Sequence, residues 1–223
     1  VKSGQDHPNG DWKYPGKVYA AILPEDLSAF DEKHQLELHV LKDGLHRNHG
    51  YTRFYDDQGQ PWGLVCSDAG VVQVAPPETP GGDWTLVPLL DEPCSDGVYL
   101  DLDGDGQPEL LTISPFHGDT VEIWRLKDGR YETVYEYPEK LPFLHAIYGG
   151  TVYGRPTVYV GNREGDKLLL GFYYDSEAGC FQTEEVDRGA GPANCMLFER
   201  CGHPALLAAN RETNEIAIYD ILP

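Results

Sequence analysis

The sequence is poor in basic residues and has no long apolar segment. Its 17 lysines and arginines stand against 37 aspartates and glutamates, which gives a formal net charge of −20. A surface this acidic repels phosphate backbones and anionic lipid headgroups, so we expect neither nucleic acid nor a membrane as a partner. No apolar run reaches the roughly 18 residues that a membrane-spanning helix requires.

Cysteine frameworks and common catalytic motifs are also missing. The five cysteines are odd in number and lack CxxC spacing, which argues against a disulfide framework and against structural zinc. Reduced thiols and the lack of a visible signal peptide favour a cytoplasmic protein, and secretion after removal of a signal peptide is the alternative. The sequence contains no GxSxG, no Walker loop and no GxGxxG after a strand, so none of these motifs indicates a reaction.

Turn-forming and aromatic residues, in contrast, are plentiful. The 25 glycines and 17 prolines are typical of a chain with many short turns, and the single methionine also argues against long helices. Apolar residues make up 40% of the chain and include 14 tyrosines, 7 phenylalanines and 4 tryptophans, enough for a sizeable core. The composition therefore predicts short elements and few long helices.

An internal repeat runs through residues 51–221. Four segments, which begin near Tyr51, Val98, Ile147 and Cys195, align on a Gly-x-Pro step. Their anchor glycines are 47, 48 and 48 residues apart, and chance rarely keeps such a period over three intervals. The anchors are Gly59, Gly106, Gly154 and Gly202.

Each repeat predicts four short strands. In the second unit, short apolar runs place them at residues 98–101, 109–114, 120–126 and 131–137, and Lys127-Asp128-Gly129 marks the last hairpin. Four-stranded units of roughly 40–50 residues in tandem are typical of β-propellers. An open β-solenoid is the alternative, although its coils are usually shorter.

The first 50 residues fit the repeat less well and leave the number of blades open. We expect one all-β, five-bladed propeller over residues 1–223, with units near 1–48, 49–95, 96–144, 145–193 and 194–223. In the alternative, the chain is part of a larger propeller, and GKVYAAI and HQLELHV are the last two strands of an incomplete unit. The last unit has room for three strands, so a segment within 17–42 could supply the strand that closes the ring.

One loop has the pattern of a calcium site. From Asp101 to Glu109 the sequence DLDGDGQPE has side-chain oxygens at positions 1, 3, 5 and 9, and we expect a backbone carbonyl ligand at position 7. Calcium takes six to eight oxygens, and glycines allow the tight backbone that brings carboxylates together. We therefore expect a structural Ca²⁺, with an ion-free Asp/Gly-rich turn as the alternative. The expected ligands are Asp101, Asp103, Asp105, Gln107 and Glu109.

The stretch DLDGDGQPELLTIS resembles the FG-GAP or VCBS repeats of integrin-α-like propellers. That resemblance implies a propeller fold and a calcium ion that stabilises the blade. Glu109 stands where those repeats usually have Asp, and the equivalent stretches FYDDQGQP, TVYGRPT and FERCGHP have lost the ligands. A second stretch, GPANCMLFE…LLAANRETNEIAIYDI, is similar to the propeller part of aldos-2-ulose dehydratase-like bacterial proteins.

In a propeller, the loop before the first strand of a blade and the loop between its second and third strands lie at the same face. His49, Asp96 and His145 precede the first strands of their units, and Asp6 and His7 hold the equivalent place near the start of the chain. His117 and the repeat-equivalent Arg163 and Arg211 lie between second and third strands, as does Asp68. We expect one funnel lined by His46, His49, Asp96, His117, His145, Arg163, Asn194 and Arg211.

Three functions fit such a funnel. The first is the binding of a carbohydrate or a small anionic metabolite, because arginines suit carboxylates, phosphates and sugar hydroxyls. The second is a sugar lyase, dehydratase or isomerase in which His49 or His145 acts as general base; imidazoles would also allow a second divalent metal in the funnel. The third is a protein-interaction scaffold. The alternative to all three functions is a structural role, because residues at repeat-equivalent positions often stabilise the repeat itself.

Overall fold

The computed structural model describes residues 12–56, 58–79 and 81–223. In this part of the chain the regular structure consists of seventeen β-strands and one short 3₁₀ helix, η1 (Arg211–Thr213). The prediction of an all-β protein is therefore confirmed. Among the described residues, no helix has the length and apolar character that crossing a membrane requires.

Most strands belong to four antiparallel sheets, in which strands that are consecutive in the sequence lie side by side. The first sheet contains β3 (Tyr51–Tyr55), β4 (Pro61–Ser67), β5 (Gly70–Ala75) and β6 (Thr85–Leu90). The second contains β7 (Asp96–Leu100), β8 (Glu109–Ser114), β9 (Thr120–Lys127) and β10 (Arg130–Glu136). The third contains β11 (Leu144–Val152), β12 (Arg155–Asn162), β13 (Leu169–Asp175) and β14 (Cys180–Asp187). The fourth contains β15 (Pro192–Arg200), β16 (His203–Asn210) and β17 (Glu215–Asp220).

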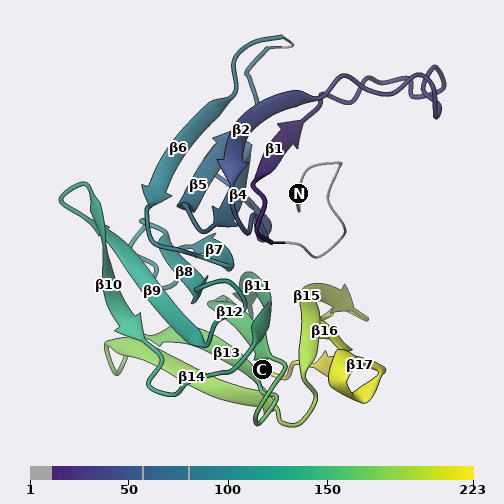
Figure 1. The fold of residues 1–223 in the computed structure, drawn as a ribbon. Coiled ribbons are helices and arrows are strands. Elements are labelled where there is room, and N and C mark those ends of the chain that lie inside the picture. Colours follow the sequence, from purple (N-terminus) through teal and green to yellow (C-terminus); the bar gives the residue numbers. More distant parts are fainter. Residues whose placement is uncertain (1–11, 57, 80) are drawn as a thin grey trace.

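The four sheets are arranged like the blades of a propeller (Figure 1). The first strand of each blade is innermost, and contacts run from β3 to β7, from β7 to β11 and from β11 to β15. The last strands β6, β10 and β14 lie on the outside. Because successive strands alternate in direction, the starts of the inner strands and the second-to-third connections lie at one end of the axis, which we call the channel mouth.

Four blades are seen in the described part of the chain, and the predicted fifth blade is not supported. In the described residues, β1 (Gly16–Ala20) pairs with β2 (His39–Leu45), and the two form a separate sheet. Residues 21–38 between them form no strand and are mostly exposed, because Pro24 and several charged residues interrupt any apolar alternation. Apolar side chains of β1 and β2 instead pack on valines of the first blade. Neither strand joins the sheet of β15–β17, so residues 17–42 do not supply its missing strand.

The repeat is visible in the sequence because each blade needs the same turn. All four anchor glycines lie between the first and second strands of a blade, with φ between 76° and 88°, in a region that side chains disfavour. No atom of the described residues lies within 4 Å of the position that a Cβ would take at any of them. Backbone conformation, and not packing, therefore accounts for the glycine in Gly59, Gly106, Gly154 and Gly202.

The core consists of apolar side chains that interlock between neighbouring blades. Leu111 and Ile113 of the second blade share one cluster with Val158 and Phe172 of the third, and all four are fully buried. Similar clusters join the first blade to the second and the third to the fourth. Burial of a side chain of this size contributes about 1.5–3 kcal/mol. Each blade is thus held in place mainly by its neighbours.

One glycine sets the closest approach of the second and third blades. A Cβ added at Gly149 on β11 would lie 2.4 Å from Cγ1 of Val98 on β7. No pair of non-bonded carbons tolerates that distance, so these inner strands can approach each other only because position 149 has no side chain.

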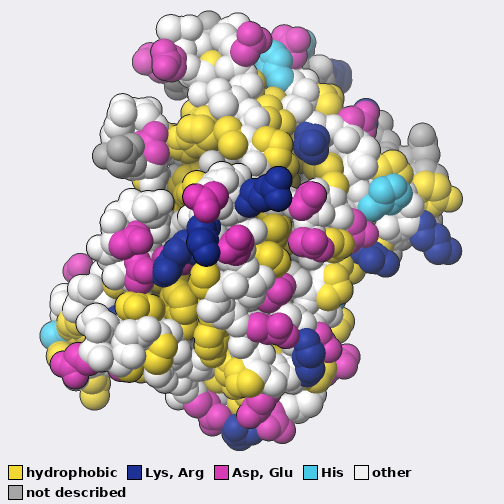
Figure 2. Space-filling view, turned by 90° about the vertical axis from the view of Figure 1, so that its left-hand side faces the viewer, with side chains coloured by type: hydrophobic (Ala, Val, Ile, Leu, Met, Phe, Trp, Pro, Cys, Tyr) yellow, Lys and Arg dark blue, Asp and Glu magenta, His cyan; other side chains and the backbone are white. Residues whose placement is uncertain are grey.

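Acidic side chains are spread over the outside of the blades. Figure 2 views the molecule from the left-hand side of Figure 1, where β10 lies, and shows many aspartates and glutamates with fewer lysines and arginines among them. This distribution agrees with the net charge of −20. It gives the protein a general attraction for cations.

We expect Gly149→Ala to lower the free energy of unfolding by about 1–3 kcal/mol, because the added methyl overpacks the contact with Val98. Urea unfolding of Gly149→Ala, Val98→Ala and the double variant measures the coupling. The double variant should lose less than the two single variants together, since Val98→Ala makes room for the methyl. Gly154→Ala, in an open turn, is the matched control and should be additive with Val98→Ala; additivity in both pairs would contradict the close approach.

Candidate functional site

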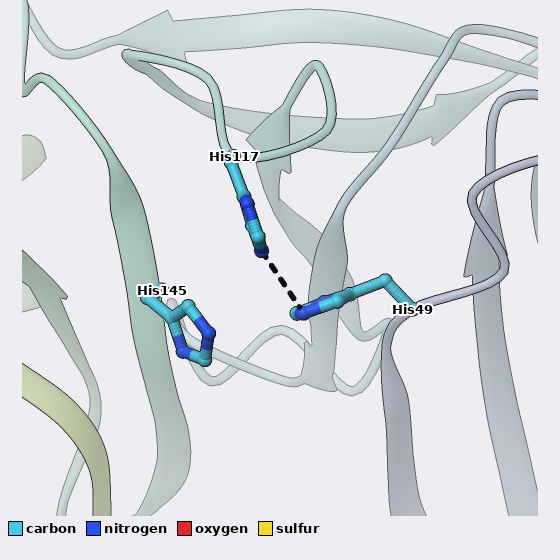
Figure 3. Close-up of side chains that lie close together, drawn as sticks. All are labelled: His49, His117 and His145. Atoms are coloured by element: carbon cyan, nitrogen blue, oxygen red, sulfur yellow. Dashed lines mark hydrogen bonds between the residues drawn. The ribbon is translucent and has the colours of Figure 1, made fainter. Parts of the chain in front are cut away.

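Three imidazoles meet at the channel mouth. Ring nitrogens of His49, His117 and His145 all lie within 4.8 Å of one another, and Figure 3 shows the three rings facing a common space. Nε2 of His117 is 3.2 Å from Nε2 of His49. The ring centroids are 4.9–5.3 Å apart, and each residue is half-buried. We call this group the imidazole cluster.

Each member of the imidazole cluster comes from a different blade. His49 lies two residues before the start of β3, and its backbone N–H donates to the carbonyl of Cys66 at 3.2 Å. His117 lies in the connection between β8 and β9, and His145 is the second residue of β11. The predicted register of the repeat therefore brings residues far apart in the sequence to the same end of the axis.

Two neighbouring groups orient the rings. The hydroxyl of Ser95, a residue that is 1% exposed, accepts the backbone N–H of His117 at 3.3 Å and lies 3.5 Å from Nδ1 of His49. Nδ1 of His145 lies 2.8 Å from the carbonyl oxygen of Ala193, in the fourth blade. Because a carbonyl oxygen only accepts, Nδ1 of His145 carries a proton, so that in the neutral form of the ring Nε2 is the nitrogen with the lone pair.

Aromatic rings border the imidazole cluster. Phe116 stacks on His117 with a centroid distance of 4.0 Å, and Phe143 lies 4.7 Å from the same ring. Trp12 packs against Phe116 at 4.5 Å. All three aromatic residues keep part of their surface accessible. The mouth thus combines nitrogen ligands and donors with flat apolar surfaces.

Three non-glycine residues in or next to the imidazole cluster and its aromatic border have a strained backbone. Arg47, His117 and Phe143 have φ values of 47°, 46° and 58°, in the left-handed region. Such conformations cost on the order of 1 kcal/mol or more each and gather at functional sites, where the surrounding structure enforces them. Two of the three belong to the imidazole cluster and its aromatic border.

Asp96 begins β7 beside the first blade. Its carboxylate lies against Gly50, where an added Cβ would be 2.5 Å from Oδ1, and it accepts the N–H of Gly97 at 2.9 Å. The residue keeps some exposed surface, yet protein atoms surround its carboxylate. This desolvation raises the pKa of Asp96 to about 7, outweighing the hydrogen bonds from Gly97 and Thr52, which lower it. Asp96 therefore exchanges its proton near neutral pH.

The two repeat-equivalent arginines have different surroundings. Arg163, with 13% of its side chain exposed, donates to Glu212 through Nε at 3.1 Å and Nη2 at 3.0 Å. Its guanidinium also lies 4.5 Å over the Phe143 ring. Arg211, in η1, is 62% exposed and lies 3.4 Å from the same carboxylate. Arg163 thus packs against the ring of Phe143, whereas Arg211 faces solvent.

The remaining predicted residues lie at the edge of the mouth or away from it. Asn194 follows Ala193, the partner of His145, and its Oδ1 accepts the N–H of Cys195 at 2.9 Å. Burial raises the pKa of Cys195 to about 12, which disfavours a thiolate nucleophile there. His46 is exposed, and like Arg211 it is not brought into the imidazole cluster. Asp6 and His7 lie outside the described residues.

Sequence reasoning missed Ser95, Glu212 and the aromatic border of Trp12, Phe116 and Phe143. Phe116 and Ser95 stand next to His117 and Asp96 in the sequence, so proximity along the chain was an available signal for both. For Trp12 and Glu212 we find none, since their contacts arise only from the packing of separate blades.

The predicted calcium loop joins β7 and β8, at the end of the second blade opposite to the mouth. Carboxylate oxygens of Asp101, Asp103 and Glu109 lie within 4.8 Å of one another. The side chains of Asp105 and Gln107 are exposed, and Oδ1 of Asp105 accepts the N–H of Gln107 at 2.7 Å. Three of the five predicted ligands therefore converge, and they have the oxygen chemistry that suits calcium.

A guanidinium already contacts these carboxylates. Nε of Arg125 on β9 donates to Oε1 of Glu109 at 2.9 Å, and its Nη2 donates to Asp103. Glu109 is fully buried, and its other oxygen accepts the N–H of Leu102 at 2.9 Å. Burial raises the pKa of Glu109, while Leu102 and Arg125 oppose that rise. Arg125 thus supplies positive charge at the place where calcium is predicted.

A separate groove of about 340 Å³ lies between β1 and the first blade. Its walls are largely apolar and include Val18, Leu41, Trp62 and Trp84, and Arg53 is the one charged side chain among the described residues that line it. Because it gathers no titratable cluster, we place the candidate site at the mouth.

We expect Arg125→Ala to lower the free energy of unfolding by about 3 kcal/mol, since it leaves the buried Glu109 carboxylate without its cation. Millimolar Ca²⁺ should restore part of this loss and should stabilise the wild-type protein less. Thermal unfolding with and without Ca²⁺ measures both effects. Lys127→Ala, on the same strand in an exposed pair with Glu132, is the control and should cost less than about 1 kcal/mol. Equal losses in the two variants would contradict a role for Arg125.

We expect Asp96→Asn to gain stability over the wild type as pH rises from about 4 to about 8. The pKa of Asp96 is higher in the folded than in the unfolded chain, so its stabilising contribution is complete at low pH and is lost as pH rises through about 7. The change in relative stability should reach roughly 4 kcal/mol, at about 1.4 kcal/mol for each unit of pKa difference. Urea unfolding of both proteins at several pH values measures it, and a pH-independent gap would refute the raised pKa.

Comparison with known proteins supports the fold and leaves the family open. The sequence matches no protein-family model, so none supports the resemblance to FG-GAP/VCBS repeats or to aldos-2-ulose dehydratase-like proteins. No curated protein matches it either.

Solved structures do resemble the chain. One is a candidate 6-phosphogluconolactonase from Bacteroides uniformis, with 16% identity and a TM-score of 0.54 over 92% of this chain and 60% of the other. A second candidate 6-phosphogluconolactonase, from Bacteroides fragilis, shows 18% identity and a TM-score of 0.53 over 85% of this chain and 58% of the other. This chain therefore spans about three fifths of the length of both. At such low identity the likeness concerns the fold alone, and it agrees with the four propeller-like blades.

Proposed function

We propose that the channel mouth binds a carbohydrate or a closely related small metabolite. The observation that carries this proposal is the imidazole cluster with its border of partly exposed aromatic rings. Sites for small molecules combine mainly apolar walls with a few fixed polar groups that orient the ligand. A sugar ring has apolar C–H faces and a rim of hydroxyls, so it matches both kinds of surface.

The charges at the mouth favour a neutral ligand over a phosphorylated one. Arg163 is paired with Glu212, which also contacts Arg211, and Arg47 lies 3.3 Å from Asp68. Each arginine thus has a carboxylate within reach, and the protein as a whole carries a net charge of −20. A small anion would have to compete with these carboxylates for the arginines.

The names of the structural neighbours are compatible with a sugar-type ligand. Both are named as candidate 6-phosphogluconolactonases, which are proteins that act on a sugar derivative. Their names do not assign that substrate to this chain, because the identity is below 20% in both comparisons.

A reaction on the bound sugar is the second candidate. The observation that favours it is the bond from Nδ1 of His145 to Ala193, which leaves Nε2 as a proton acceptor beside His49 and His117. A fixed acceptor of this kind suits removal of a proton next to a carbonyl, as in a lyase, dehydratase or isomerase. The calcium loop would support the blade from the far end and take no part in binding.

Ligand-observed NMR and thermal shift in D₂O test the proposal with a panel of neutral sugars, lactones, sugar acids and sugar phosphates. We expect binding in the neutral group, with affinity at least about tenfold weaker in Phe116→Ala and His145→Gln. Tyr55→Ala is the control, because Tyr55 is an exposed aromatic residue at the far end of β3. In D₂O, loss of the signal of a carbon-bound proton of the sugar would show that this proton is removed and exchanged. That result would support the second candidate function, a reaction on the bound sugar.

The proposal fails if no member of the panel binds. It also fails if Phe116→Ala binds as well as Tyr55→Ala. Unfolding curves of the unliganded variants separate loss of the site from loss of the fold.

A further inference from the structure

We infer that the imidazole cluster is a binding site for one divalent transition-metal ion of the zinc class. The inference names a cofactor for the proposed ligand site, so its role in sugar binding rests on the proposed function, whereas metal binding itself does not. It depends on three observations: the geometry of the nitrogens, the groups that contact His49 and His145 outside the cluster, and the chemistry of the donor set.

The geometry is close to that of a bound ion. Two zinc–nitrogen bonds of about 2.0–2.1 Å at a tetrahedral angle place their nitrogens roughly 3.3 Å apart. Nε2 of His49 and Nε2 of His117 are 3.2 Å apart, and a ring nitrogen of His145 completes a set within 4.8 Å. Small rotations of the His145 ring would close the triangle.

The outer contacts are those that metal-bound histidines make. A ligating imidazole usually donates its second N–H to a carbonyl or hydroxyl, which fixes the tautomer that leaves the other nitrogen bare. Nδ1 of His145 donates to Ala193 at 2.8 Å. The buried hydroxyl of Ser95 lies 3.5 Å from Nδ1 of His49, and it also accepts the backbone N–H of His117 at 3.3 Å, which holds the chain that carries the third ring.

The donor set selects the metal. Imidazole nitrogen suits zinc, copper, nickel and iron, whereas calcium and magnesium prefer oxygen. Among the described residues three histidines converge here, and three histidine ligands are the pattern of a site that keeps one position for water or a substrate oxygen. That position would face the aromatic border, where a sugar hydroxyl or carbonyl could bind. The net charge of −20 adds a general attraction for cations.

Nothing in the sequence pattern pairs these ligands locally. The three histidines are separated by 68 and 28 residues, and the site forms only when three blades come together. This distinguishes it from the calcium loop, in which all predicted ligands lie within nine consecutive residues. The two sites would also take different ions.

The test is titration of chelator-treated protein with Co²⁺ and Zn²⁺. The background is Cys180→Ser/Cys201→Ser, which removes the two exposed thiols as competing ligands. We expect one equivalent of Co²⁺ to give the visible absorption of a four-coordinate ion and Zn²⁺ to displace it. Millimolar Ca²⁺ should leave the spectrum unchanged. Binding should weaken about 100-fold or more in His117→Gln and about 10–100-fold in Ser95→Ala, in which a positioning residue is lost.

His203→Gln is the matched control, because His203 is exposed at the start of β16 and lies outside the cluster. A second measurement needs no variant: Co²⁺ should shift or broaden the NMR signals of three of the eight histidines in the wild-type chain. Absence of a one-equivalent site, or equal affinity in His117→Gln and His203→Gln, would overturn the inference.

The outcomes separate this inference from the proposed function. If a sugar binds equally well in chelator and in Zn²⁺ while no metal site is found, the inference fails and the proposed function stands. If the metal binds but no sugar of the panel does, the metal site stands without the proposed function. We expect sugar binding to be at least about tenfold weaker in chelator than in Zn²⁺.

Discussion

The close packing of neighbouring inner strands is the constraint on which the rest of the structure depends. Each blade buries its apolar face against the next, and at Gly149 the approach leaves no space for a methyl group. Sheets packed at this distance, one after another, turn around a common axis. Their inner strands then start at the same end, which is the reason why imidazoles from three blades can meet at all.

Much of the fold followed from the sequence because one local requirement recurs. The left-handed turn between the first two strands demands a glycine in every blade, and the anchors from Gly59 to Gly202 mark those turns. In the second unit, the predicted strands at 109–114 and 120–126 agree with β8 and β9 to within one residue. The number of blades did not follow, since residues 12–50 lack this turn and form only β1 and β2.

The register of the repeat predicted which residues of the candidate site lie at the same end of the axis. Repeat positions alone indicated that His49, His117 and His145 would share one end of the axis, and the structure brings them together. Register says nothing about how far a side chain extends or which partner it meets. Arg163 and Arg211 occupy equivalent positions, yet one is held between Glu212 and Phe143 and the other is exposed. Tertiary contacts of Ser95, Trp12 and Glu212 decide such differences, and no periodic signal encodes them.

The origin of the three histidines in three separate blades has a mechanical consequence. Any molecule or ion that all three rings hold must be released before those blades can separate, so its binding free energy adds to the work of pulling them apart. Repeat proteins often open one unit at a time from an end, because each unit contacts only its neighbours. A shared ligand would join the first, second and third blades into a single cooperative unit, and the fourth blade would be the one left to open alone.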